Sequence, residues 1–149
     1  MKDYLELRKQ ELKKRGAKGF TLMEMLIVVA IIAVLIAIAI PVFTSQLENS
    51  REATDAANIR SAYATATAKV MTGDGKTGYS AGPIDIQQTT AGWANTSVKD
   101  QKIGNAALSS IEPVNTNKAY VNVAADGTVK LSLGSAESGY TVVNPISGS

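Results

Sequence analysis

The sequence contains neither cysteine nor histidine. Without thiols no disulfide can cross-link the chain. The absence of thiolates and imidazoles also removes the commonest nucleophiles, general bases and zinc ligands. Any catalysis would depend on carboxylates and lysines alone. We therefore expect a protein that is not an enzyme and that holds no cofactor and no metal.

Basic residues are scarce outside one short stretch. The formal net charge is +2, but residues 1–19 carry seven Lys and Arg against three Asp and Glu, whereas the remainder carries eight against ten. A mildly acidic body lacks the clustered basic residues that neutralise phosphates, so no specific nucleic-acid partner is expected. A basic start before an apolar segment is typical of an end that stays in the cytoplasm, which places the C-terminal part outside.

Polar side chains are absent from residues 25–40, a run of sixteen. As a helix this run spans only ~24 Å, but residues 20–43 span ~36 Å, which crosses the ~30 Å hydrocarbon core of a bilayer with some tilt. A domain of this size has no surface broad enough to bury such a run, so we predict a single transmembrane segment. That register places Glu24 inside the segment, where a carboxylate is costly and marks a site of function.

A basic flank, the Gly19-Phe20 junction and Glu24 stand together in the stretch KGFTLME, residues 18–24. In this pattern the chain resembles the type IV pilins, whose precursors carry a short basic leader (a class III signal peptide). The resemblance is close as far as residue 42. Beyond that residue it concerns architecture only.

The resemblance implies how the chain is processed and assembled. A prepilin peptidase would remove the leader, residues 1–19, by cutting between Gly19 and Phe20, and would methylate the new N-terminal Phe20. Glu24 would then be the fifth residue of the mature chain. It would pair with the N-terminal amine of a neighbouring subunit, because that amine is the only cation near its level in a nearly dry filament core.

A general secretory signal peptide is the competing interpretation. Ala37 and Ala39 supply a small-x-small cleavage site before Ile40. That pathway needs neither the long basic start nor an acid at the mouth of the apolar run, whereas the pilin interpretation explains both.

The predicted fold is α+β, with one long N-terminal helix. Its membrane or filament-core half is residues 20–43. Residues 44–71 contain no Gly or Pro and predict an amphipathic half, while Gly16 and Gly19 predict an extended junction before the helix. Pro41 should kink or loosen the helix, and the resemblance implies that this stretch can melt during filament packing. The apolar stripe of the second half consists of Ile59, Tyr63, Ala66 and Val70.

The C-terminal residues, 119–149, predict a small antiparallel sheet of about three strands that packs on the helix. Residues 119–123 and 129–133 alternate apolar and polar side chains across an Asp-Gly turn, and residues 140–143 form a third strand. Residues 72–118 are expected to be a variable connecting loop with a short helix near residues 105–111. The candidates for the core of the sheet are Tyr120, Val121 or Val123, Leu131, Leu133 and Val142.

The main hypothesis is a structural subunit of a type IV pilus. Such a subunit would wait in the membrane as a single-pass protein until the pilus assembly machinery polymerises identical copies into a helical extracellular filament for adhesion or twitching motility. The alternatives are a pseudopilin of a type II-like secretion system, a competence pilin for DNA uptake, or a tethered adhesin. A calcium site of the kind seen in some secretion pseudopilins is a minor alternative, because the loops of Asp74 and Asp126 lack the acidic spacing of a calcium loop.

Overall fold

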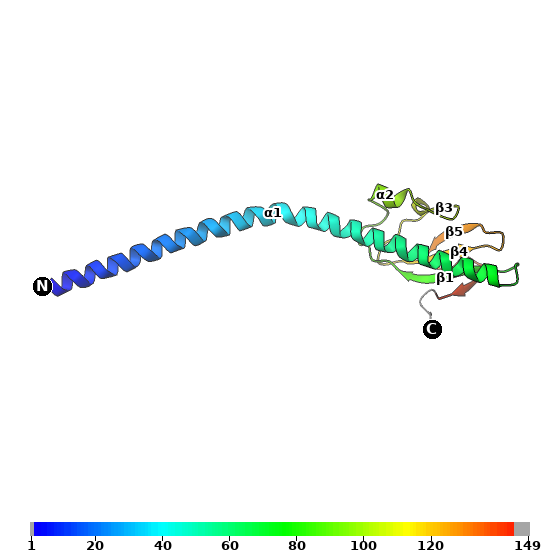
Figure 1. The fold of residues 1–149 in the computed structure, drawn as a ribbon, viewed down its shortest axis with the longest axis horizontal. Coiled ribbons are helices and arrows are strands. Elements are labelled where there is room, and N and C mark those ends of the chain that lie inside the picture. Colours follow the sequence, from blue (N-terminus) through cyan, green and yellow to red (C-terminus); the bar gives the residue numbers. More distant parts are fainter. Residues whose placement is uncertain (1, 145–149) are drawn as a thin grey trace. The chain divides into compact units, whose positions relative to one another are not determined.

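The computed structural model describes residues 2–144, with side chains for residues 2–13 and 21–144 (Figure 1). It divides into two compact units, Met1–Thr44 and Ser45–Ser149. The first unit is helical. The second unit contains the remainder of the same helix and all of the described strands.

Helix α1, Lys2–Thr72, contains both of the predicted halves and ends where the glycine-rich stretch begins. Its backbone is helical through Gly16 and Gly19, so the expectation of an extended junction is wrong. The physical reason is that a glycine costs a helix only ~1 kcal/mol relative to alanine. The flanking lysines, arginine, alanine and leucine favour the helix strongly enough to outweigh two such costs.

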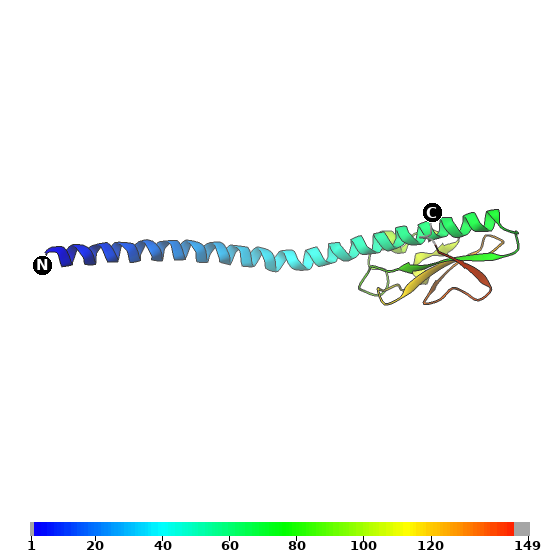
Figure 2. The same cartoon turned by 90° about the horizontal axis from the view of Figure 1, so that it is seen from below.

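The second unit is built on a four-stranded sheet with the order β5-β4-β1-β6. Strand β4 pairs antiparallel with both β5 and β1, while β6 pairs parallel with β1. The C-terminal part of α1 lies along one face of this sheet in both views (Figures 1 and 2). The α+β prediction is confirmed, with four strands in place of about three. The sheet is mostly antiparallel, and the parallel pairing of β6 differs from the predicted all-antiparallel sheet. The strands are β1 Gly78–Asp85, β4 Lys118–Val123, β5 Val129–Leu133 and β6 Tyr140–Val143.

Strand β1 is central in the sheet, although the sequence predicts a loop there. Gly82 and Pro83 read as turn residues, but the register with β4 shifts between Ala81 and Ile84, and this bulge accommodates them. The Tyr120 ring covers Gly82 so closely that a Cβ at that glycine would collide with it. The strand thus needs glycine for close approach, not for a turn.

The rest of the predicted loop region is also folded. Trp93 is buried, and its indole N–H donates to the carbonyls of Leu108 (2.8 Å) and Ile111 (3.1 Å). The short helix predicted near residues 105–111 is a single 3-10 turn. The elements of this region are α2 Thr96–Lys99, β2 Lys102–Ile103, β3 Ala106–Ala107 and the 3-10 turn η1 Leu108–Ser110, with β2 and β3 paired antiparallel.

The predicted apolar stripe of α1 faces the sheet. Ile59 and Ala66 are fully buried, and Tyr63 and Val70 pack against the core from its rim. Among the strand candidates Val121 and Val123 are buried and Leu131 and Leu133 are partly buried. Two candidates are wrong because they lie on the opposite face. Tyr120 covers Gly82 there, and Val142, which pairs with Ser80, is 52% exposed.

Ile59 tests this core. Ile59→Ala should lower the free energy of unfolding by ~2–5 kcal/mol, because it leaves a cavity at a fully buried position. Denaturant unfolding of the full chain in detergent micelles, followed by the fluorescence of the single Trp93, measures the change. The exposed neighbour variant Asn58→Ala is the matched control and should shift stability by no more than ~0.5 kcal/mol. Equal effects of the two substitutions would contradict the assigned helix face.

Candidate functional site

Between Leu22 and Phe43 the first unit presents an apolar surface on all sides, interrupted only by Glu24. The large apolar side chains of residues 22–43 are each 48–67% exposed. Within the described residues, one helix is long and apolar enough to cross a membrane, and none of its most apolar stretch is buried inside the protein. Such a surface needs an apolar environment, which a bilayer or other copies of the same helix can supply.

Glu24 is exposed on this apolar helix. It follows Phe20 by four residues in a continuous helical backbone, so the two positions share one face, about 6 Å apart along the axis. The three ion pairs found among the described side chains all lie in the second unit and do not include Glu24. The side chain of Phe20 lies outside the described set, so the predicted processing residues Gly19 and Phe20 are placed by backbone alone.

Pro41 lies inside α1, as predicted, near the end of the apolar stretch. Its ring nitrogen cannot donate the usual helical hydrogen bond to the carbonyl one turn earlier. One turn later the Thr44 hydroxyl donates to the Pro41 carbonyl (3.0 Å). The backbone is nevertheless helical on both sides of the proline.

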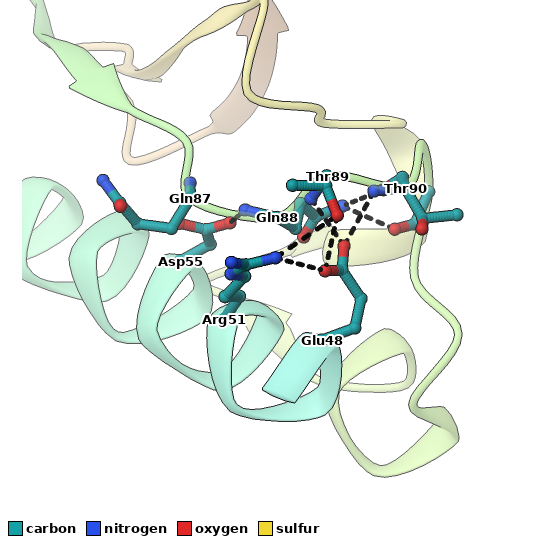
Figure 3. Close-up of polar contacts among 8 residues, drawn as sticks. Glu48, Arg51, Asp55, Gln87, Gln88, Thr89 and Thr90 are labelled. Carbon is teal, nitrogen blue, oxygen red and sulfur yellow. Dashed lines mark hydrogen bonds and ion pairs between the residues drawn. The ribbon is translucent and has the colours of Figure 1, made fainter. Parts of the chain in front are cut away.

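In the second unit three carboxylates of α1 hold the segment of residues 87–95 against the helix. We call Glu48, Glu52 and Asp55 the carboxylate row. Each accepts hydrogen bonds from two consecutive backbone amides, and the arrangement around Glu48 and Asp55 is shown in Figure 3. The donors are Thr89 (2.6 Å) and Thr90 (2.7 Å) to Glu48, Ala94 and Asn95 (both 2.9 Å) to Glu52, and Gln87 (2.8 Å) and Gln88 (2.9 Å) to Asp55.

The outermost member of the row is Glu48. Burial by itself raises the pKa of the Glu48 carboxyl. Hydrogen bonds from Thr90, Thr89 and the Arg51 guanidinium outweigh that effect and hold the pKa below its ordinary value of 4.5. Arg51 lies 3.2 Å from the carboxylate and is the cation that the row contacts. The ionised form of Glu48 therefore stabilises the fold.

Asp55 is the innermost member, with no exposed surface. Burial raises the pKa of its carboxyl above the ordinary value of 3.8, and the amide hydrogen bonds from Gln87 and Gln88 offset this only in part. The negative charges of Glu48 and Glu52 raise the pKa further. Ionised Asp55 thus costs the fold free energy even though its hydrogen bonds are good.

The buried side chain of Gln88 secures the same segment from its other side. Its amide nitrogen donates to the carbonyls of Thr90 (3.2 Å), Gly92 (2.5 Å) and Pro113 (2.6 Å). The backbone carbonyl of Gln88 accepts from the Asn115 amide (2.8 Å). Residues 87–95 are therefore bound both to α1 and to the chain that precedes β4.

An amphipathic helix ordinarily turns its acidic residues toward solvent, but Glu52 and Asp55 are buried. The two side chains are 1% and 0% exposed. The missed signal is the spacing of Glu48, Glu52 and Asp55, which continues at i, i+4 and i+7 and leads into Ile59. The row is a polar extension of the apolar stripe.

The two acidic loops considered for calcium are explained by local turns. Asp74 accepts from the amides of Lys76 (3.0 Å) and Thr77 (2.8 Å), and Asp126 accepts from the amide of Thr128 (2.8 Å). Over the described part of the chain, no group of three or more His, Cys, Asp or Glu residues is placed to hold a metal ion. Both aspartates serve as turn residues.

The carboxylate row predicts opposite pH dependences for two matched variants. The lowered pKa of Glu48 gives stability that is present above pH 4.5 and lost as pH falls through the folded-state value, so the deficit of Glu48→Gln should grow with rising pH. The raised pKa of Asp55 gives stability that is lost as pH rises above 3.8, so the deficit of Asp55→Asn should shrink with rising pH. Urea unfolding from pH 3 to 7, followed by Trp93 fluorescence, measures both. Slopes of the same sign would refute the assignment.

Known proteins share the N-terminal part of this chain. Residues 14–40 match the family described as the prokaryotic N-terminal methylation motif. The chain is similar to the type IV narrow pilus major component PilA5 of Thermus thermophilus, with 50% identity over 54 residues that make up 34% of this chain and 47% of that protein. The chain thus matches about half the length of this curated relative, and no solved structure matches it at a significant level. The motif, the long helix that contains it and the α+β unit behind it together support a relationship of this chain to the type IV pilins.

Proposed function

We propose that this chain is the structural subunit of a type IV pilus. The observation that carries the proposal is the apolar half of α1, which has no partner among the described residues and is continuous with a folded α+β unit. A bilayer can hold that helix before assembly. The same helices from other copies can replace the lipid in a filament, so assembly exchanges one apolar environment for another.

Such an exchange brings little net hydrophobic gain, so it does not by itself set the register between subunits. Glu24 can set it. A carboxylate in a dry helical core is costly unless a cation lies beside it, and the α-amine of a processed chain is such a cation. In this proposal the prepilin peptidase cuts between Gly19 and Phe20 and methylates Phe20, and the new amine pairs with Glu24 of a neighbouring subunit.

This pairing links processing to assembly. An unprocessed chain continues as helix through residue 19 and has no α-amine at the level of Glu24. It can rest in the membrane, with its basic leader on the cytoplasmic side, but it cannot neutralise a neighbour's carboxylate. The assembled filament then lies outside the cell, with the sheet unit on its surface, where adhesion or twitching motility would take place.

The mass of the mature subunit tests the processing step. We expect protein sheared from the cell surface to lack nineteen residues, to begin at Phe20 and to carry one added methyl group. Intact-mass spectrometry and N-terminal sequencing measure all three. A product that begins at Ile40 would instead show secretory cleavage. Full-length chain in ordinary filaments would overturn the link between processing and assembly.

Replacement of Glu24 tests the register. Glu24→Ala should leave cleavage intact and lower filament yield at least tenfold, because an unpaired buried charge costs ~3–5 kcal/mol per subunit. The exposed Glu112→Ala is a matched control and should assemble normally. Electron microscopy and the yield of sheared filaments are the readouts. Long filaments also separate a pilus from a short pseudopilus, and normal yield from Glu24→Ala would refute the proposed pairing.

A further inference from the structure

Strand β5 forms one edge of the four-stranded sheet. The Ala124 amide donates to the Thr128 carbonyl (2.8 Å), and the Gly134 amide donates to the Lys118 carbonyl (2.7 Å). These bonds fix the alternation of the antiparallel ladder, because only every second residue bonds to the neighbouring strand. Even-numbered residues of β5 bond to β4. The residues whose backbone groups point away from the sheet are Val129, Leu131 and Leu133.

The first outward amide of this edge is already occupied, since Val129 donates to the Asn105 side-chain carbonyl (2.7 Å). Within the described residues, no hydrogen bond is found to the outward amides and carbonyls of Leu131 and Leu133. Both leucine side chains are only half-buried at the rim of the core. We call the backbone and side chains of residues 131–133 the β5 edge.

A cleft runs along the β5 edge, and apart from the strand itself most of the residues that line it have small side chains. Ala106 and Ser110 form part of the lining, and Ser135, Ala136 and Ser138 form another part. Lys130 and Glu137 line it as well. Added strands lie ~4.8 Å from the strand they join, so the approaching backbone needs neighbours without bulky side chains. The alanines and serines of the lining meet that condition, while the two longer side chains, Lys130 and Glu137, are paired with each other at 3.0 Å.

Edge strands in natural proteins are usually guarded by charges, prolines or bulges. The β5 edge carries none of these. The charged residue of the strand, Lys130, is engaged with Glu137 at 3.0 Å. Two hydrogen-bonding positions and two half-exposed leucines are thus available to a pairing strand.

We propose that the β5 edge pairs with the β5 edge of a second copy of this chain. The sequence Leu131-Ser132-Leu133 reads the same in both directions, so antiparallel pairing centred on Ser132 sets each leucine opposite a leucine. The outward groups of Leu131 and Leu133 then form four hydrogen bonds with their counterparts. Ser132 faces Ser132 of the other copy in a non-hydrogen-bonded pair. The paired stretch carries no charge, so nothing in it repels its own copy.

This contact is two-fold symmetric, whereas neighbours within a helical filament are related by a rotation and a translation. It therefore joins copies on different filaments. Three residues per copy bury far less than the ~1,000 Å² that a stable isolated interface needs. The inference rests on the proposed filament, in which many displayed copies add their weak contacts together.

Single cysteines test the pairing, since the chain has none of its own. In Ser132→Cys the thiols of paired copies would face each other with Cα atoms ~4.5 Å apart, which permits a disulfide. Val142→Cys, on the other edge strand, is the matched control. After mild oxidation of sheared filaments, we expect at least tenfold more covalent dimer from Ser132→Cys than from Val142→Cys on non-reducing gels.

Ser132 also forms hydrogen bonds with Asn122 and Ser135, which Ser132→Cys would disturb. Two lysine variants, Leu133→Lys and Val142→Lys, provide a second test that leaves Ser132 unchanged. Filaments of Leu133→Lys should stay in the supernatant at a low centrifugal force at which unmodified and Val142→Lys filaments sediment as bundles. Equal dimer yields together with equal sedimentation overturn the β5 pairing, as do Ser132→Cys adducts with other proteins. Filament yield is measured in parallel, and an unmodified chain that forms no filaments overturns the proposed function as well.

Discussion

One helix has to satisfy two environments, and the rest of the structure depends on how α1 does so. From Met25 to Phe43 its large side chains are apolar on every face, which suits lipid or other helices. A few residues later, at Glu48, the face toward the sheet unit becomes polar and then apolar again from Ala56 onward. A single helix, with no loop between its halves, therefore passes from an apolar environment to contact with the sheet.

The carboxylate row explains how the connecting segment can be close to the helix without an apolar contact. Backbone amides that leave water need acceptors, and residues 87–95 make no ladder with a strand that could supply them. Three carboxylates accept from six such amides. Burial of a carboxylate and, to a smaller extent, the nearby negative charges of Glu48 and Glu52 carry an electrostatic cost that raises the pKa of Asp55. The fold tolerates that cost because unsatisfied amides would be worse.

Much of the architecture could be predicted from the sequence, and the exceptions have physical causes. The strands β4, β5 and β6 follow from alternating apolar residues and an Asp-Gly turn, which are local signals. Strand β1 could not be recognised because Gly82 and Pro83 are explained only by the Tyr120 ring and the bulge beside them. The burial of Glu52 and Asp55 depends on amides some thirty to forty residues away in the chain. Such long-range partners leave no trace in local composition, and the placement of Gly19, Phe20 and Glu24 as a site still rests on the family pattern.

The continuous helix through Gly16 and Gly19 has a consequence for the leader. A peptide bond inside a helix is shielded by the surrounding turns, so the proposed cut requires local fraying before an enzyme can reach it. Two glycines within four residues lower the free energy of that opening by ~2 kcal/mol relative to alanines, which corresponds to about a thirtyfold larger open population. If the chain is cut as proposed, glycine at the junction sets how often that peptide bond is exposed.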